Sequence, residues 1–537
     1  MTRLKSPGLT QTILRSVLAC AALALMPATL STTQAKGTAE HVVVVVFDGM
    51  RPDFVTPQYC PNLYSLATNG VFFRRNHCVY VSTTIVNGTA IATGSYPGHS
   101  GILANSDYRQ ELNFTTSIAS EVLDTIRRGD IARQGKYVAV DTAAELIQDA
   151  GFHTYIAGTK SVVLLHDRSM RRTDTEAHKN SVVLGRGLAM PRATTEALNK
   201  VNDDKAFPDD FKTPNIASDG WTTKALTRGL WRKGVPKYSV MWLSDPDVTQ
   251  HAKGVGAPES LSAIEASDKN LGELLKVLDE KKLREKTDIF VVSDHGFSTI
   301  SRSADIAAAL RANKLNAQTK LDNPERGDVM VVNLGGSALI YVIERDEATI
   351  HKVAETLQVC DFTGVLFSRL PIEGTFPLDT IHYPTDPAKG APDFVVSMRW
   401  QDSTNENGAP GMLIATGGSR NAGTHGSLSR FEMNNTLIAS GPDFKQGVIS
   451  QIPSGNIDVT PTVLHILGVP QKEKMDGRVL REGFREATGP GPEVKERHLE
   501  ATRQLGFMKW SQYLKIYDVD GATYYDEGNG SPVLKSP

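Results

Sequence analysis

Cysteine is scarce in this chain, with four residues among 537. A framework of disulfides therefore does not hold the fold together. If the N-terminal segment discussed below is removed, Cys60, Cys78 and Cys360 remain. This odd number allows at most one disulfide, and the sequence leaves open which two residues would pair.

An excess of basic side chains is also lacking. The chain has 58 Lys and Arg residues against 60 Asp and Glu residues, which gives a formal net charge of −2. Binding to nucleic acid through bulk charge requires a positive surplus, so this class of partner is excluded. With 40% hydrophobic residues and no low-complexity tract, the composition is that of an ordinary globular protein.

No apolar run is long enough for a stable membrane span, which needs about 20 residues. The run Val17–Met26 follows three basic residues and precedes a small-residue segment that ends near Ala35. This order predicts a signal peptide over residues 1–35 and export to the periplasm or the medium. The alternatives are a membrane anchor or a buried helix.

Three apolar runs predict strands buried on both faces of a sheet, because polar residues do not alternate within them. They cover residues 41–47, 238–243 and 288–292. Amphipathic patterns predict helices between them, at residues 61–69, 143–150 and 261–280. The alternation indicates an α/β fold with a mostly parallel central sheet flanked by helices.

Two later segments depart from this pattern. Residues 300–415 are rich in Gly, Pro and Asn, as at 404–411, and we expect an irregular insert or cap there. Gly489–Pro492 resembles a linker, so residues 483–537 are expected to form a linker and a charged helical tail.

Acidic and imidazole side chains follow each predicted strand, at the sheet edge where α/β proteins bind ligands. Asp48 ends the first run, although an isolated aspartate there also suits a helix cap or a turn. Asp247 and His251 are four residues apart and would share one side of a helix. Such pairs are also common on surfaces.

Two further clusters complete the set. Asp294 and His295 precede a glycine at the end of the third strand, and His425 lies between glycines in residues 423–427. The histidine could equally be an ordinary loop residue. Taken together, three aspartates and three histidines divide into two sites of mixed nitrogen and oxygen ligands, which favours two Zn²⁺ ions over magnesium.

A pair of metal ions about 3.5–4 Å apart can hold the attacking and leaving oxygens of a displacement, but it needs a nucleophile. Residues 80–89 pass from an extended run into a predicted helix, where backbone N–H groups bind phosphate. Ser82, Thr83 and Thr84 are candidates for this nucleophile, and each could instead be a helix cap. Position alone does not choose among them.

The order of these clusters resembles the alkaline phosphatase superfamily, and within it the type I phosphodiesterase/nucleotide pyrophosphatase branch. The resemblance covers roughly residues 40–482 and implies an alkaline-phosphatase-like catalytic domain over residues 36–482. It is carried by residues 46–53, 83–87, 93–102, 246–251, 293–296, 423–426 and 458–462.

The resemblance implies a role for each site residue. Thr84 would be the nucleophile and Asn105 a phosphate contact. One zinc ion would take Asp247, His251 and His425, and the other would take Asp48, Asp294 and His295 beside Thr84. The implied activity is hydrolysis of phosphodiesters or nucleotide pyrophosphates through a phospho-threonine intermediate.

The sequence also departs from the family pattern. Ile85 and Val86 replace a Phe-Pro pair, and Gly88 stands where a histidine is common. Lys160 resembles the basic residue of monoesterase and phosphonate-hydrolase branches, and it would favour a dianionic phosphate unless it is a solvated surface lysine. The alternatives are thus a phosphomonoesterase or phosphonoacetate-hydrolase-like enzyme, or a pseudoenzyme. The expected partner is a small phosphorylated substrate, and the oligomeric state is not indicated.

Overall fold

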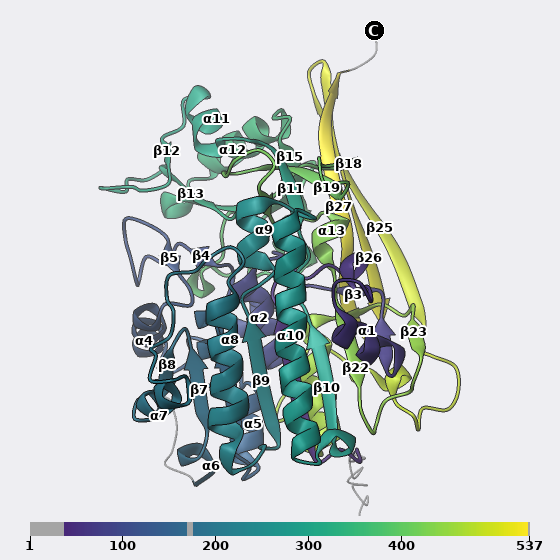
Figure 1. Ribbon diagram of the computed structural model, residues 1–537. Coiled ribbons are helices and arrows are strands. Elements are labelled where there is room, and N and C mark those ends of the chain that lie inside the picture. Colours follow the sequence, from purple (N-terminus) through teal and green to yellow (C-terminus); the bar gives the residue numbers. More distant parts are fainter. Residues whose placement is uncertain (1–36, 169–175, 535–537) are drawn as a thin grey trace, which may run out of the picture. The chain divides into compact units, whose positions relative to one another are not determined.

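The computed structural model describes residues 37–168 and 176–534, so the predicted signal peptide lies outside the described residues. A nine-stranded sheet forms the centre of the fold (Figure 1), in the order β23-β2-β22-β10-β1-β9-β6-β7-β8. Its strands are β1 (His41–Phe47), β2 (Val71–Phe73), β6 (Thr154–Gly158), β7 (Val182–Gly185), β8 (Leu188–Met190), β9 (Tyr238–Leu243), β10 (Thr287–Val292), β22 (Leu437–Ser440) and β23 (Val448–Ser450).

The three predicted strands are confirmed as β1, β9 and β10, and they lie together in the sheet. β1 pairs in parallel with both neighbours, so that Val42 lies opposite Asp288 on one side and Tyr238 on the other. β6 and β7 continue the parallel order, whereas β22 and β8 run antiparallel to their neighbours. The prediction of a mostly parallel sheet is therefore confirmed.

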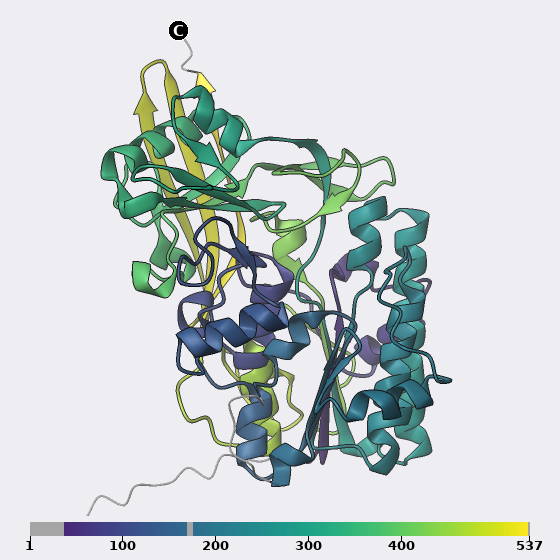
Figure 2. The same cartoon turned by 90° about the vertical axis from the view of Figure 1, so that its left-hand side faces the viewer.

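Helices cover both faces of this sheet, as Figure 2 shows with the strands nearly edge-on. β1 shows why: Val42, Val44 and Val46 enter one apolar core, and Val43, Val45 and Phe47 enter another. The first core includes α2 (Thr84–Thr93), α5 (Ala143–Asp149) and α14 (Val459–Leu467), and the second includes α1 (Pro61–Thr68), α8 (Ile216–Lys224) and α10 (Pro258–Glu280). Burial of each such side chain contributes about 1.5–3 kcal/mol.

Residues 300–415 are not irregular, contrary to the prediction. They hold all the strands of a six-stranded sheet and two α-helices, because the Gly, Pro and Asn clusters are turns between short strands. Residues 404–411, for example, join β18 (Trp400–Thr404) to β19 (Pro410–Ala415). The sheet has the order β12 (Ala317–Gln318), β13 (Val329–Asn333), β14 (Ser337–Val342), β17 (Phe394–Met398), β15 (Thr363–Ser368), β16 (Phe376–Pro377), with α11 (Ile306–Ala312) and α12 (Glu347–Gln358).

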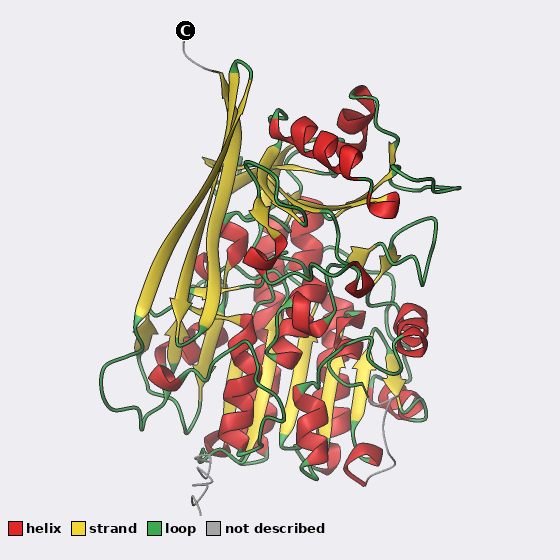
Figure 3. Cartoon of the chain, turned by 180° about the vertical axis from the view of Figure 1, so that it is seen from behind, coloured by secondary structure: helices red, strands yellow, loops and turns green. Residues whose placement is uncertain are grey.

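The C-terminal region is a long antiparallel sheet, so the prediction of a helical tail is wrong (Figure 3). Its strands are β25 (Val494–Leu505), β26 (Met508–Val519) and β27 (Ala522–Leu534). Along β26, Trp510, Gln512, Leu514 and Ile516 are buried and the residues between them are only partly buried, which is the two-residue period of a strand. The Gln512 amide also bonds both backbone groups of Leu366 in β15.

The remaining elements connect these layers. They are β3 (Asn76–His77), β4 (Ser106–Asp107), β5 (Ile118–Ala119), β11 (Ser298–Ser303), β20 (Gly423–Thr424), β21 (Asn434–Asn435), β24 (Ser454–Gly455), α3 (Pro97–Ser100), α4 (Leu123–Ala132), α6 (Glu176–Lys179), α7 (Thr194–Val201), α9 (Asp247–Lys253) and α13 (Arg430–Met433). Cys60, Cys78 and Cys360 are free thiols. Among the described residues, no helix has the length and apolarity needed to cross a bilayer.

Candidate active site

The predicted ligand residues meet at the carboxyl edge of the central sheet. Asp48 follows β1, Asp247 begins α9 just after β9, and Asp294 follows β10. Within the described residues, two groups have ligand atoms that all lie within 4.8 Å of one another. One consists of Asp247, His251 and His425, and the other of Asp48, Asp247 and His295.

The three carboxylates are buried, and each has one oxygen fixed and one oxygen free. Trp242 Nε1 donates to Asp48 Oδ2 at 2.8 Å, and the Gly49 N–H donates to Asp294 Oδ1 at 3.0 Å. Asp48 Oδ1, Asp247 Oδ1 and Asp294 Oδ2 have no hydrogen-bond partner among the described residues. Leaving such oxygens buried and unpaired is unfavourable, and a bound cation would compensate for it.

The three histidines direct Nε2 toward the same place. Their Nδ1 atoms contact backbone carbonyls, those of Gly423 for His251, Gly296 for His295 and Ser82 for His425, at 2.8–3.1 Å. A carbonyl only accepts, so Nδ1 carries a proton, and the neutral form of such a ring has its lone pair on Nε2. The Nε2 atoms of His251 and His425 lie 3.3 and 3.5 Å from Asp247 Oδ1.

The protonation states agree with this arrangement. Burial lowers the pKa of His295, and burial and the neighbouring His295 together lower that of His425 well below the usual value, so both rings are neutral near pH 7. Neutral imidazole is the form that binds metals. The two rings are stacked with centroids 3.6 Å apart, whereas the His251 side chain is 42% exposed and borders solvent.

The residues therefore fit a pair of divalent cations, and the mixed donor set suits zinc. The second geometric group differs from the predicted one, because it contains Asp247 in place of Asp294. Asp294 remains close, with Oδ2 3.2 Å from His295 Nε2. Asp247 thus lies between the two groups and belongs to both.

Lys160 lies inside this cluster. It follows β6, and its Nζ is 2.9 Å from Asp48 Oδ2 and 2.5 Å from Asp247 Oδ2. Burial opposes the charge of Lys160, but Asp247 and Asp48 raise its pKa above the usual value. Its side chain is 16% exposed, so the alternative of a solvated surface lysine does not hold.

The three candidate hydroxyls have different surroundings. Ser82 Oγ donates to the Ser427 carbonyl, and Thr83 Oγ1 is buried without a hydrogen-bond partner among the described residues. Thr84 is the first residue of α2, and its Oγ1 lies 3.2 Å from His295 Nε2. Of the three hydroxyls, that of Thr84 makes the hydrogen bond to a predicted metal ligand.

The predicted phosphate contact lies beside the same helix terminus. Asn105 Oδ1 accepts a hydrogen bond from the Ile85 N–H at 2.8 Å. Its side chain therefore borders the first turn of α2, which starts at Thr84. A phosphate bound at this helix N-terminus would meet backbone N–H groups and the amide of Asn105.

The departures from the family pattern on α2 have a packing explanation. Ile85 and Val86 are each only 2% exposed and belong to apolar cores. A Cβ added to Gly88 would lie 2.4 Å from a methyl group of Val162, so a histidine would not fit without rearrangement. All three positions are buried in the protein interior.

Supporting residues were not predicted from the sequence. Trp242 binds Asp48, and Asp219 accepts hydrogen bonds from the Ser244 and Asp245 N–H groups just before α9. Asn87 donates to the Thr83 carbonyl at 3.2 Å and so helps to fix the start of α2. These residues lie within ordinary strand and helix patterns, so only the position of Asn87 in the nucleophile motif could have indicated a role.

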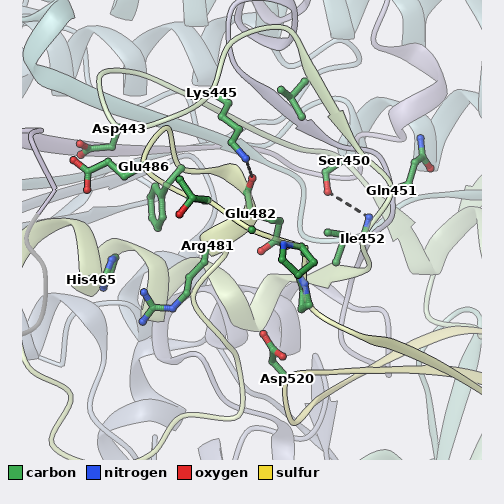
Figure 4. Close-up of a pocket in the computed structure, with 18 of the residues that line it drawn as sticks. Asp443, Lys445, Ser450, Gln451, Ile452, His465, Arg481, Glu482, Glu486 and Asp520 are labelled. Atoms are coloured by element: carbon green, nitrogen blue, oxygen red, sulfur yellow. Dashed lines mark hydrogen bonds between the residues drawn. The ribbon is translucent and has the colours of Figure 1, made fainter. Parts of the chain in front are cut away.

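A separate cavity of about 790 Å³ lies near β23 and the 481–492 segment (Figure 4). None of the predicted site residues lines it. Lys445 Nζ donates there to the Glu482 carbonyl at 3.1 Å. The cavity is thus distinct from the cluster at the carboxyl edge of the sheet.

Comparisons with known proteins identify the family of this chain. The sequence profile of the type I phosphodiesterase/nucleotide pyrophosphatase family matches residues 42–428. Venom phosphodiesterase 2 of Crotalus adamanteus is 25% identical over 276 residues, and human ectonucleotide pyrophosphatase/phosphodiesterase family member 7 is 23% identical over 294 residues. These matches cover 50% and 54% of this chain, but only 28% and 55% of the respective relatives.

A solved structure supports the fold. An inactive variant of murine ectonucleotide pyrophosphatase/phosphodiesterase 5, in complex with AMP, matches with a TM-score of 0.56 and 19% identity. The match covers 83% of this chain and 100% of that one. With the profile spanning most of the sequence, the chain belongs to the type I phosphodiesterase/nucleotide pyrophosphatase family.

Proposed function

We propose that this protein is a secreted two-zinc phosphohydrolase that cleaves phosphodiesters or nucleotide pyrophosphates. The observation that carries the proposal is the position of Thr84 Oγ1, 3.2 Å from His295 Nε2 in a cluster with three unpaired carboxylate oxygens. One zinc ion would be held by Asp247, His251 and His425, and the other by Asp48, Asp294 and His295. When bound, such ions lower the pKa of a hydroxyl and neutralise charge on phosphate oxygens.

The chain's own residues would carry out a double displacement. Thr84 Oγ1 loses its proton to solvent and attacks phosphorus, a new oxygen–phosphorus bond forms, and the leaving group departs with the electron pair of the broken phosphorus–oxygen bond and takes up a proton. Asn105 and the N–H groups at the start of α2 bind the non-bridging oxygens while charge develops on them. Water then attacks the phospho-threonine, which releases phosphate or a phosphomonoester and restores the hydroxyl.

The test is a comparison of hydrolysis rates on bis-p-nitrophenyl phosphate and p-nitrophenyl phosphate with protein of known metal content. We expect faster cleavage of the diester, near two zinc ions per chain, loss of both activities on chelation, and better recovery with zinc than with magnesium. A metal content near zero, together with no turnover, would instead support a pseudoenzyme.

Lys160 favours a second candidate, a phosphomonoesterase or phosphonoacetate-hydrolase-like enzyme, because its ammonium group lies among the site carboxylates. If Lys160 contacts phosphate, Lys160→Ala should slow monoester hydrolysis by about 10–100-fold, which corresponds to one charge-assisted hydrogen bond. The diester, with a single negative charge, should lose much less. The measurement is kcat/KM for both substrates.

Because Lys160 also touches two predicted ligands, metal content has to be measured in the variant. Lys276→Ala, on the exposed face of α10, is the matched control for loss of a lysine charge. Equal losses on both substrates with unchanged metal content would argue against a phosphate contact.

A further inference from the structure

Glu432 is a fully buried carboxylate that the sequence motifs did not single out. It lies in α13, is 0% exposed and has no salt-bridge partner among the described residues. Burial of a carboxylate without a neighbouring cation is unfavourable by several kcal/mol unless hydrogen bonds compensate. The partners of the hydrogen bonds that Glu432 accepts therefore indicate its role.

Both carboxylate oxygens of Glu432 face segments that carry site residues. Oε2 accepts hydrogen bonds from the Ser427 N–H at 2.6 Å and from Ser82 Oγ at 3.3 Å, and Oε1 accepts one from Ser427 Oγ at 2.7 Å. Ser427 lies two residues after His425, and Ser82 lies two residues before Thr84. One side chain thus joins the histidine loop to the nucleophile segment.

Ser82 continues the connection to the imidazole ring. The Ser82 hydroxyl donates a bifurcated hydrogen bond to Glu432 Oε2 and to the Ser427 carbonyl. The same hydroxyl oxygen accepts a hydrogen bond from the Gly426 N–H at 3.1 Å. The Ser82 carbonyl accepts the Nδ1 proton of His425 at 2.8 Å. The direction of His425 Nε2 therefore depends on where Ser82 is held.

The backbone of the same helical turn holds the third segment. The Glu432 carbonyl accepts the Gly296 N–H at 2.7 Å, and the Phe431 carbonyl accepts the Phe297 N–H at 3.0 Å. A Cβ at position 296 would lie 2.2 Å from the Phe431 oxygen, so this close approach requires glycine. The loop that contains Asp294 and His295 is thereby tied to α13.

We propose that Glu432 is a positioning residue, which fixes the orientation of His425 and its distance from Thr84 through Ser82 and Ser427. The proposal rests on the proposed function only in assuming that His425 binds a metal ion. A carboxylate suits the task because both of its oxygens accept, whereas an amide offers one acceptor oxygen. Groups that orient metal-ligating histidines typically change metal affinity about 10–100-fold when removed.

The test measures zinc affinity of the metal-depleted protein by competition with a chromogenic chelator. Glu432→Ala should weaken the affinity of at least one site by about 10–100-fold, and Glu432→Gln should have a smaller effect because it keeps part of the bonding. With cobalt in place of zinc, the visible spectrum of Glu432→Ala should also change, since it reports ligand geometry.

Asp288→Asn is the matched control. Asp288 is also 0% exposed, but it lies near the opposite end of β10 from Asp294, and its Oδ2 has no hydrogen-bond partner among the described residues. We expect this variant to keep the zinc affinity and cobalt spectrum of the original protein whatever happens to its melting temperature. If Glu432→Ala does not fold, Glu432→Gln and Ser82→Ala provide the comparison.

Unchanged zinc affinity and cobalt spectrum in the folded Glu432 variants would overturn the proposal, and so would an equal loss of affinity in Asp288→Asn. These readouts do not require turnover. A protein that binds zinc but cleaves no phosphoester would refute the proposed function while leaving the role of Glu432 testable.

Discussion

Thr84→Ala is expected to reduce phosphoester hydrolysis by at least about 10³-fold, because loss of a covalent nucleophile removes the intermediate and leaves only binding and electrostatic effects. Metal content should stay near that of the original protein. The Thr84 hydroxyl would add one contact to the predicted set of three carboxylates and three imidazoles, five of which form the two geometric groups. Initial rates and zinc content on the same preparation check both statements.

Two controls make this result specific. Thr83→Ala removes a neighbouring buried hydroxyl that has no hydrogen-bond partner among the described residues, and we expect it to keep most of the activity. Thr84→Ser should retain part of the rate. Activity retained in Thr84→Ala but lost in Thr83→Ala or Ser82→Ala would move the nucleophile to one of those residues.

Asp247→Asn is expected to disturb both metal sites together. Its carboxylate belongs to both geometric groups, and Oδ1 faces the Nε2 atoms of His251, His295 and His425. Lys160 and His251 hold the pKa of Asp247 well below its usual value against the effect of burial, so the group is ionised at neutral pH. Replacing this charge by an amide should reduce zinc content below one ion per chain and activity by about 10²-fold or more.

The matched control for this prediction is Asp268→Asn. Asp268 is a buried carboxylate on α10 that accepts hydrogen bonds from the Asn62 and Leu63 N–H groups, and it belongs to neither geometric ligand group. Its loss should lower the melting temperature without changing zinc content. Two zinc ions retained by Asp247→Asn, measured by elemental analysis, would contradict a shared role for Asp247.

Much of the fold could be predicted from the sequence because its signals are local. The apolar run at 41–47 has no polar alternation, and it forms an interior strand that pairs with β10 on one side and β9 on the other. The C-terminal strands were missed because another local signal was given more weight. Charged residues suggested a helix, while the two-residue period along β26 went unused.

The candidate site also has features that the sequence predicts and features that only tertiary packing determines. The residue types and their positions after β1, β9 and β10 could be predicted, because parallel strands bring their carboxyl ends to one edge. Position along the chain did not choose among Ser82, Thr83 and Thr84, since all three suit a helix start, and it was the family resemblance that implied Thr84. The contact between Thr84 Oγ1 and His295 Nε2 joins residues 211 positions apart and depends on tertiary packing.

The sequence alone determined the family, the α/β class and the set of chemical groups at the site, because motifs and periodicity are properties of neighbouring residues. Tertiary structure decided which groups touch. It placed Lys160 in contact with Asp48 and Asp247, and it placed Asp247 in both ligand groups. It also brought the buried carboxylate of Glu432 to the loop that carries His425. Distances of a few ångströms between segments hundreds of residues apart arise only when the layers pack, and hydrogen bonding and metal binding depend on those distances.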